Sequence, residues 1–410
     1  MKSRFVIIGS SAAGMAAANA IRKQDSDSVI RIISKEFYPP YARIFLPKII
    51  TGEIALSDIL IKSEEQICKL MIEVVFGKEV TNIDPGRKTL SLDDGTQLGY
   101  DKLLISTGAS PKLPDIRGIS LANVFGLRTL HDAEKISRQA KSSKRVVIIG
   151  GGLVSLKAAE ALSNFDLDID VIVRSPRILS QMLDNTSAEL VYRAVKSHGV
   201  TVHFGCDVEE ISGKTEVETV ALSDGKNISC QMVIVGKGVT PNLSFLNGSG
   251  IRTDRGIPVD KYQRTNLSDI YAAGDIAQTP DFFKKGVSVK ALWPNAVQQG
   301  NIAGLNMSGK KIENPEEINS NIVKLFGIDI ASCGQIKGDD SCNEVVYQDN
   351  DVYRKLIFNK DVLIGAILAG NVDSIGILRS LILSKKKVFN IRNLLMNKSF
   401  RYTSILESVV

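Results

Sequence analysis

The chain has 410 residues, of which 44% are hydrophobic and 23% charged, and its formal net charge is +6 at pH 7. This balance is typical of a globular enzyme of two or three domains and excludes a disordered or fibrous protein. No run approaches the roughly 18 to 20 apolar residues of a membrane helix, and MKSRFVIIGS enters a strand directly instead of a cleavable apolar segment. We therefore expect a cytoplasmic protein that binds neither a membrane nor a nucleic acid.

The cysteines and histidines give no sign of a metal site. The five cysteines, at positions 68, 206, 230, 333 and 342, form no CxxC pair and have no zinc or iron–sulfur spacing. The three histidines, at positions 131, 198 and 203, do not cluster in the sequence. We therefore expect reduced, mostly buried thiols and no metal.

In chain order, one pattern occurs twice: a strand, a glycine loop, a helix, a second strand, and later a strand ending in a glycine turn. The first copy is VIIGSSAAGMAAANAI (6–21), VIRIIS (29–34) and YDKLLISTGASP (100–111). The second is VVIIGGGLVSLKAAEAL (146–162), IDVIVR (169–174) and CQMVIVGKGVTPN (230–242). Apolar strands alternating with helices predict a parallel sheet covered on both faces, so each copy is a separate βαβ nucleotide-binding unit.

The remaining elements set the domain boundaries. GIPVDKYQRTNLSDIYAAGDIAQ (256–278) follows the completed second unit, so we expect it to close the first domain. Beyond it, NEVVYQ, RKLIFN and VLIGAILAG predict strands, followed by a basic helical tail. The prediction is an α/β fold with two Rossmann-like, three-layer ββα domains and a small α+β C-terminal domain. Their bounds are 1–112 with 242–314, 113–241, and 315–410.

Both glycine loops fit a dinucleotide pyrophosphate, because such a turn lets the backbone approach the phosphates and aims helix N–H groups at them. The first loop carries Gly9, Ser11 and Gly14, and the second Gly150, Gly152 and Ser155. Each therefore has one serine in place of a glycine. A lone glycine motif is weak evidence, but two in the same strand–helix context predict two dinucleotide sites.

The residue at the end of the second strand distinguishes the nucleotides, since an acid there binds the ribose 2′-OH and a base accommodates a 2′-phosphate. In the second unit this residue is Arg174, followed by Ser175 and Arg177, which favours NADPH over NADH. The alternative is an exposed Arg174 that contacts no ligand. In the first unit, Glu36 is the candidate for the adenosine ribose.

These segments, above all NLSDIYAAGDIAQ, resemble the FAD- and NAD(P)H-dependent pyridine nucleotide-disulfide oxidoreductases over residues 1 to about 310. The resemblance implies FAD in the first domain, NADH or NADPH in the second, and an Asp275 that hydrogen-bonds the ribityl chain. It implies FAD-binding positions at Gly9, Ser11, Ala13, Gly14, Glu36, Arg43, Lys48, Val80, Thr107, Gly108, Arg128, Gly274, Asp275 and Trp293. It implies NAD(P)H-binding positions at Gly150, Gly152, Ser155, Lys157, Arg174 and Gly236.

The segment YPPYARIFLPKIITGE (38–53) indicates a subgroup. Disulfide-active relatives carry a redox cysteine where this chain has Ile44, and Cys68 lies outside the motif. Without a thiolate at that position, thiol–disulfide chemistry is excluded there. Arg43, Leu46 and Lys48 instead resemble the Arg-x-x-Leu-x-Lys pattern of rubredoxin reductases, ferredoxin reductases and the flavin part of nitrite reductases.

In that subgroup the lysine matching Lys48, the catalytic candidate, commonly pairs with a glutamate in the helix after the second loop. Here that position is Lys157, and two lysines would repel unless a phosphate, Glu160 or another acid lies between them. The alternative is a Lys157 side chain that turns to solvent.

The resulting hypothesis is an enzyme that transfers a hydride from NAD(P)H to FAD and then electrons to a small acidic carrier, rubredoxin or ferredoxin. Two alternatives stay open: an NAD(P)H oxidase that forms hydrogen peroxide, and a flavin-bearing subunit of a larger redox complex. From Ser374 to Leu406 the chain has seven Lys or Arg and no acid, which fits either a solvated helix face or a docking site for an acidic partner. Monomer and homodimer stay equally open.

Overall fold

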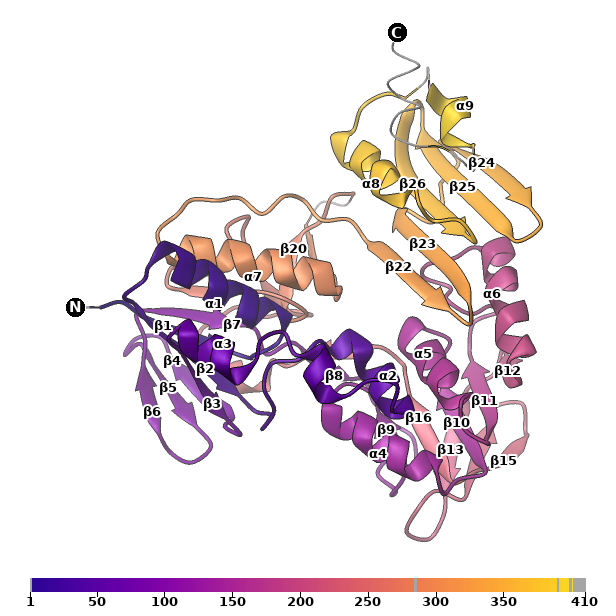
Figure 1. Cartoon of the computed structure of the whole chain (residues 1–410), viewed down its shortest axis with the longest axis horizontal. Helices are drawn as coiled ribbons and strands as arrows, with labels where there is room; N and C mark the ends of the chain where they lie inside the picture. The colour runs from indigo at the N-terminus through magenta and orange to yellow at the C-terminus, as the bar shows by residue number, and fades with distance from the viewer. Residues whose placement is uncertain (1, 284–285, 389–390, 398–399, 401–410) are drawn as a thin grey trace. The chain divides into compact units, whose positions relative to one another are not determined.

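The computed structural model describes residues 2–283, 286–388, 391–397 and 400. The chain divides into two compact units, each built from segments that are far apart in the sequence. The first unit contains residues 1–46, 54–110 and 239–317, and the second contains 47–53, 111–238 and 318–410. Figure 1 colours the chain by residue number, so that the segments of each unit can be followed.

The first unit is built on a parallel five-stranded sheet with the order β19-β7-β1-β2-β3. Its strands are β1 (Arg4–Ile8), β2 (Val29–Ser34), β3 (Ile72–Phe76), β7 (Lys102–Ile105) and β19 (Ile270–Ala272). The strand β19, from the segment expected to close the first domain, is thus an edge strand beside β7. Successive residues of β1 point to opposite faces, so that Ile7 and Ile8 belong to two different cores.

One face of this sheet is covered by α1 (Ala12–Gln24) and α7 (Trp293–Met307), which pack side by side (Figure 1). Antiparallel strands β4 (Val80–Asp84), β5 (Thr89–Leu92) and β6 (Gln97–Gly99) cover the other face through Ile83 and Leu90. The smaller elements of the unit are η1 (Arg43–Phe45), η2 (Leu56–Ile59), α3 (Glu64–Lys69), β8 (Ala109–Pro111), β17 (Val239–Pro241), η3 (Ser244–Leu246), β18 (Ile257–Pro258), β20 (Ala277–Pro280) and β21 (Val287–Ser288).

The second unit repeats this plan with the parallel order β12-β11-β10-β16-β9. Its strands are β9 (Val124–Gly126), β10 (Arg145–Ile149), β11 (Asp168–Val173), β12 (Val200–Phe204) and β16 (Met232–Val235). The accompanying elements are α2 (Leu46–Thr51), α4 (Leu130–Ala140), α5 (Leu153–Leu162), α6 (Asn185–Ser197), β13 (Val208–Ser212), β14 (Thr219–Leu222) and β15 (Asn227–Ser229).

The C-terminal part of the second unit is an antiparallel sheet with the order β22-β23-β26-β25-β24. The elements are β22 (Ser320–Leu325), β23 (Ile328–Gly334), β24 (Cys342–Asp349), β25 (Val352–Asn359), β26 (Val362–Ala369), α8 (Ile375–Ser384) and α9 (Arg392–Leu395). The three strands predicted from the sequence are β24, β25 and β26. The sequence prediction missed β22 and β23.

The basic tail differs from the helix expected there. Of its basic residues, α8 contains only Arg379, because the helix ends at Ser384 and Lys385 adopts a left-handed conformation with φ of 53°. The three lysines at 385–387 follow as an exposed loop, and Arg392 begins α9. Lys398 and Arg401, two of the seven basic residues counted between Ser374 and Leu406, lie outside the described residues.

The predicted fold class, α/β with two three-layer units and a small α+β C-terminal domain, is thereby confirmed. Among the described residues, none of the helices combines the length and the apolar character that crossing a membrane requires.

Candidate functional site: two glycine loops and the side chains around them

The first glycine loop needs its glycines for close backbone packing. Gly9 has φ of 107°, and a Cβ there would lie 2.3 Å from the carbonyl oxygen of Ser106. A Cβ on Gly14 would lie 1.9 Å from the carbonyl oxygen of Gly9. Ser11 is the N-cap of α1, but its side chain accepts no capping hydrogen bond. The first-turn amides of α1 are therefore left without a side-chain cap, as a site for a pyrophosphate requires.

Ala13 lies where α1 and α7 come closest. A Cβ on Gly300 of α7 would be 2.1 Å from the carbonyl oxygen of Ala13. Gly274, with φ of 83°, also lies against Ala13, and its N–H donates to Oε1 of Gln299 at 2.7 Å. The turn that carries Asp275, the predicted ribityl-binding acid, is thus held between the two helices, and Asp275 itself is half-buried.

Two predicted FAD residues, Glu36 and Arg43, form one cluster. The Arg43 guanidinium pairs with Oε1 of Glu36, and the Tyr41 hydroxyl donates to Oε2 of Glu36 at 2.6 Å. Both charged side chains are about three-quarters buried. Tyr41 was not predicted from the sequence, although it lies in the segment YPPYARIFLPKIITGE. Val80, also predicted at the FAD, is the buried first residue of β4.

Thr107 and Gly108 follow β7 and are held by a residue that the sequence prediction omitted. Asn242 donates its side-chain amide to the Thr107 carbonyl at 2.9 Å, and its backbone N–H to the Gly108 carbonyl at 3.1 Å. Gly108 has φ of 65°, a conformation that favours glycine. Asn242 is the last residue of the segment CQMVIVGKGVTPN, but no role was predicted for it from the sequence.

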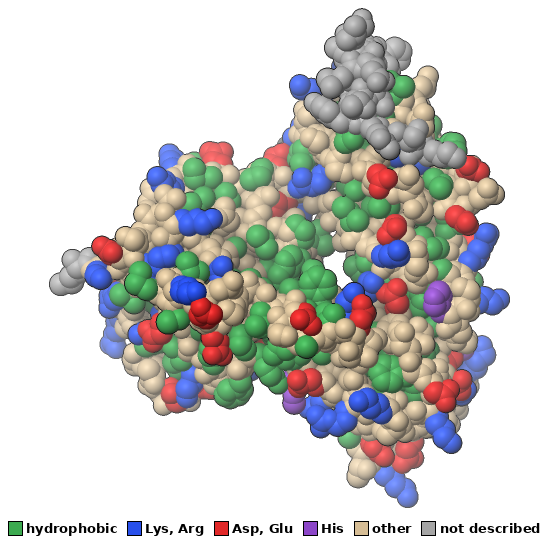
Figure 2. Space-filling view, in the orientation of Figure 1, with side chains coloured by type: hydrophobic (Ala, Val, Ile, Leu, Met, Phe, Trp, Pro, Cys, Tyr) green, Lys and Arg blue, Asp and Glu red, His purple; other side chains and the backbone are tan. Residues whose placement is uncertain are grey.

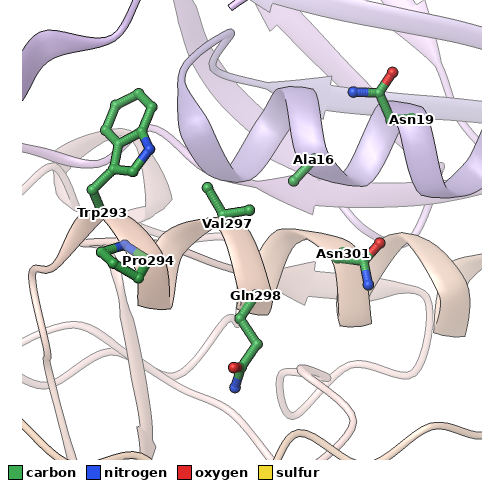
Figure 3. Close-up of a pocket in the computed structure, with 7 residues that line it drawn as sticks. All are labelled: Ala16, Asn19, Trp293, Pro294, Val297, Gln298 and Asn301. Carbon is green, nitrogen blue, oxygen red and sulfur yellow. The ribbon is translucent and has the colours of Figure 1, made fainter. Parts of the chain in front are cut away.

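Trp293 begins α7 and lines a groove of about 610 Å³ within the first unit (Figure 3). The groove runs between α1 and α7, with Ala16 and Asn19 from α1 and Val297, Gln298 and Asn301 from α7. Trp293 is half-buried and packs against the core under α1.

Lys48 and Arg128, both predicted at the FAD, belong to the second unit. Lys48 pairs with Glu53 at 2.7 Å, and both side chains are about half exposed. At Arg128, the backbone N–H donates to Asp132 at 3.0 Å, beside the N-cap of α4. Glu53 is the last residue of the segment YPPYARIFLPKIITGE, but no role was predicted for it from the sequence.

The second loop accommodates its serine. Gly150 has φ of 115°, and a Cβ there would lie 2.5 Å from the carbonyl oxygen of Gly236. Ser155 is fully buried, and its hydroxyl donates to the same carbonyl at 3.3 Å. A Cβ on Gly236 would lie 2.0 Å from that hydroxyl, so Gly236 makes room for Ser155. Gly152 is the N-cap of α5, which again has no side-chain cap.

Lys157 has its own acidic partner. Its ammonium pairs with Oε2 of Glu160 at 2.7 Å, one turn along α5, and the side chain is 29% exposed. The other oxygen of Glu160 accepts from the backbone N–H of Phe326 at 2.6 Å, in the turn between β22 and β23. Lys157 therefore neither points freely into solvent nor lacks a counter-charge, and Glu160 ties α5 to the C-terminal sheet.

The two arginines after β11 have different partners. Arg177 donates to the carbonyls of Leu183 and Ser180 and to Oδ1 of Asn185, so its guanidinium holds the loop that it belongs to. Arg174 is exposed, and no hydrogen bond or ion pair to it is found among the described residues. Of the two arginines, Arg174 is thus the one that holds no neighbouring group among the described residues.

The position of the redox cysteine is occupied by Ile44, which is 56% exposed. Of the five thiols, those at 206, 230 and 333 are buried, Cys342 is half-buried and Cys68 is exposed. Burial raises the pKa of both the Cys230 and the Cys333 thiol to about 12. These two buried groups are accordingly protonated thiols, and not nucleophiles, at neutral pH.

Comparison with known proteins gives the family. The model of the pyridine nucleotide-disulphide oxidoreductases matches residues 3–300, and that of the rubredoxin NAD+ reductase C-terminal domain matches residues 320–386. The NADH-rubredoxin oxidoreductase of Clostridium acetobutylicum is 31% identical over 397 residues, covering 96% of this chain and 98% of the relative.

Two further proteins are similar to this chain. The assimilatory nitrate reductase electron transfer subunit of Bacillus subtilis is 30% identical over 94% of this chain, but the chain spans only 51%, about half, of that relative's length. The solved NAD-dependent persulfide reductase from A. fulgidus is 29% identical with a TM-score of 0.89, covering 95% of this chain and 78% of the other.

The family match extends over both glycine loops, whose uncapped helices and tightly packed glycines fit the two dinucleotides, FAD and NADH, that the family uses. It confirms the resemblance drawn from the sequence and the class of NAD(P)H-dependent flavin oxidoreductase. The chain belongs to the pyridine nucleotide-disulphide oxidoreductase family.

Proposed function

We propose that this protein is an electron-transfer reductase that passes electrons from NADH or NADPH, by way of FAD, to a small acidic redox carrier of the rubredoxin or ferredoxin type. The observation that carries the proposal is the combination of two uncapped glycine loops with Ile44 in place of a reactive thiol. When bound, FAD would take a hydride from the nicotinamide and release electrons to the carrier.

The proposed domain assignment follows the two loops. Residues 1–112 and 242–314 would hold FAD, residues 113–241 would hold NAD(P)H, and residues 315–410 would serve as an interface or carrier-docking domain. Hydride transfer itself requires no side-chain acid or base, so the residues of the chain would act in this scheme by binding and orienting the cofactors.

Within the first unit, the amides at the start of α1 would bind the pyrophosphate, and the Glu36 carboxylate would face the adenosine ribose. Because Arg43 and Tyr41 already hold both oxygens of Glu36, that carboxylate is fixed before any ribose binds. Asp275 would bind the ribityl chain from the turn held by Gln299. The remaining predicted FAD positions, including Val80, Thr107, Arg128 and Trp293, stay proposals of the same kind.

Within the second unit, the amides at the start of α5 would bind the second pyrophosphate, and Arg174 would receive a 2′-phosphate. Lys48 would provide a positive charge beside the flavin. Its half-exposed pair with Glu53 is a weak constraint, since exposed ion pairs contribute only about 0–1 kcal/mol, so Lys48 is free to change partner.

The decisive experiment is anaerobic titration of the purified, FAD-loaded protein with NADH and NADPH separately, followed by addition of oxidised rubredoxin or ferredoxin. We expect the flavin absorbance to bleach with one nucleotide and to recover on addition of the carrier. Oxygen consumption equal to the rate of nucleotide oxidation, and insensitive to the carrier, would instead identify a peroxide-forming oxidase. A flavin that neither nucleotide reduces would identify a subunit of a larger complex.

A further inference from the structure

Glu317, the last residue of the first unit, is a buried carboxylate surrounded by neutral donors. The residue is 3% exposed. Its oxygens accept from Thr279 Oγ1 at 3.2 Å, Asn295 Nδ2 at 3.1 Å, Asn314 Nδ2 at 2.8 Å, and Gln299 Nε2 at 2.9 and 3.0 Å. Because every contact is donated to it, the group is an acceptor on both oxygens.

No lysine or arginine of the described residues forms an ion pair with this carboxylate. The nearby buried ammonium of Lys290 pairs instead with Asp281 at 3.2 Å and donates to Ser288. A buried charge without a counter-charge is costly, and a neutral residue at 317 would avoid that cost. The position therefore calls for an explanation other than packing.

The hydrogen-bond network leads from Glu317 to the turn predicted to bind FAD. Gln299 directs its NH₂ group at Glu317, which leaves its carbonyl oxygen facing the Gly274 N–H at 2.7 Å. The carboxylate thus fixes which way the Gln299 amide points. Without it, the amide could rotate and present an N–H group to the Gly274 N–H.

The same carboxylate also holds the start of α7. Asn295 is the third residue of that helix, two residues after Trp293. Thr279 belongs to β20, which follows the Gly274–Asp275 turn. A single buried group therefore connects the turn, the strand after it and the first turn of α7, all within the first unit.

We propose that Glu317 is a positioning residue for the FAD site, acting through Gln299 on the Gly274–Asp275 turn and through Asn295 on α7, and that its negative charge lowers the reduction potential of the bound flavin. The inference rests on the proposed function, in that the first unit binds FAD. It assigns a role to a residue that contacts neither nucleotide loop.

The test compares Glu317→Gln with Glu316→Gln, the neighbouring exposed glutamate, in the full FAD-loaded chain. Each variant removes one negative charge from the same stretch of chain. We expect the flavin potential of E317Q, measured by dye-coupled anaerobic titration, to move to more positive values, while E316Q stays at the wild-type potential. A merely structural role would leave the potential of the remaining bound flavin unchanged, and that result would overturn the charge role.

Gln299→Leu tests the positional role separately, and it carries the test if E317Q does not fold. This change keeps the carboxylate but removes the link to Gly274. We expect the affinity of the deflavinated protein for added FAD, followed by flavin fluorescence quenching, to fall at least tenfold; an unchanged affinity in folded Q299L protein would overturn the proposal. A wild-type protein that binds no FAD would instead contradict the proposed function.

Discussion

Arg174 and Arg177, the two arginines after β11, are predicted to differ in function. Arg177 holds its own loop, whereas Arg174 is proposed to bind the 2′-phosphate of NADPH. Replacing Arg174 by alanine should raise the KM for NADPH by roughly tenfold or more, because a charge-assisted hydrogen bond to phosphate contributes about 1.5–3 kcal/mol. The KM for NADH should change little, since NADH has no 2′-phosphate. Steady-state kinetics with both nucleotides measure this split.

The control for that substitution is Arg193→Ala, which removes an exposed arginine of α6 that pairs with Glu189. This variant should leave both KM values at the wild-type level. If R174A raises the KM for NADPH and NADH equally, Arg174 contributes to general affinity and not to the choice between nucleotides.

Substitution of Lys48 tests whether its positive charge acts on the flavin. Lys48→Ala should slow flavin reduction several-fold or lower the flavin potential, because a cation near the flavin favours its anionic reduced form. Lys69→Ala removes another exposed lysine in a local ion pair, with Glu65, and should change neither quantity. Stopped-flow rates and potentials that are identical in K48A and wild type would remove Lys48 from the site.

At the scale of elements, a hydrogen bond between the half-buried Asp184 and the buried Tyr353 joins α6 to β25. Asp184 is the N-cap of α6, where its Oδ1 accepts from the backbone N–H of Ser187. Its Oδ2 accepts from the Tyr353 hydroxyl at 2.5 Å and lies 3.4 Å from Nζ of Lys355. Burial alone would raise the pKa of Asp184, but the hydrogen bonds from Tyr353 and Ser187 and the charge of Lys355 lower it below its usual value.

This lowered pKa has a defined consequence for stability. A carboxyl whose folded pKa is depressed stabilises the fold above its unfolded pKa of about 4 and loses that contribution as the pH falls through the folded value. Tyr353→Phe removes a hydrogen bond to a charged group and should reduce the free energy of unfolding by about 2 kcal/mol at pH 7. The difference between variant and wild type should shrink below pH 4.

Chemical denaturation at pH 7 and pH 3, followed by circular dichroism, measures the effect of Tyr353→Phe. Tyr347→Phe in the neighbouring strand β24 is the matched control, since Tyr347 is half-buried and donates to Asp349 at the longer distance of 3.4 Å. A Y353F variant as stable as Y347F at pH 7 would show that the Asp184 contact does not hold α6 to the sheet.

The elements also show which parts of the fold can be predicted from sequence. The parallel strands were readable because continuous apolar runs such as VVII have no polar face. The glycine loops were readable because a side chain would not fit there: a Cβ on Gly9, Gly14 or Gly150 would lie 1.9 to 2.5 Å from a carbonyl oxygen. Strand β22 was missed because its exposed and half-exposed residues do not alternate regularly. Strand β23 was missed because its buried run, IASC, is short and contains a serine. The helix expected in the basic tail is present as α8 and α9, but the lysines at 385–387 lie in the loop between these two helices.

For the side chains around the loops, sequence reasoning could propose a role only for residues that stand at motif positions. Glu36, Arg43 and Asp275 stand at motif positions, whereas the partners that fix them, such as Tyr41 and Gln299, come from contacts formed in three dimensions. Ion pairs likewise depend on the fold. The sequence offered Glu160 as one of several possible neighbours of Lys157, and the structure pairs the two residues. The pair of Lys48 with Glu53 came from the structure alone.

At the scale of the whole molecule, charge should govern encounter with the carrier. The net charge is +6, and on the face shown in Figure 2 acidic and basic side chains are interspersed. Attraction to an acidic carrier would therefore come from the net positive charge of the whole chain, and it would be screened within about 8 Å at physiological salt.

Raising the salt concentration from 20 mM to 500 mM should lower the rate constant for carrier reduction several-fold. Reduction of a small neutral acceptor such as a quinone should stay nearly constant over the same range, and it serves as the control. A carrier rate that does not depend on salt would contradict electrostatic steering of an acidic partner.

The discontinuity of the first unit has a consequence for synthesis on the ribosome. Its parallel sheet needs β19, so it cannot be completed before residue 272 has been made, whereas every strand of the second parallel sheet has been made by residue 235. Domains form as units once their chain is available. The nascent protein should therefore acquire a protease-resistant nucleotide-binding core around residues 124–235 while its N-terminal strands still lack their last partner.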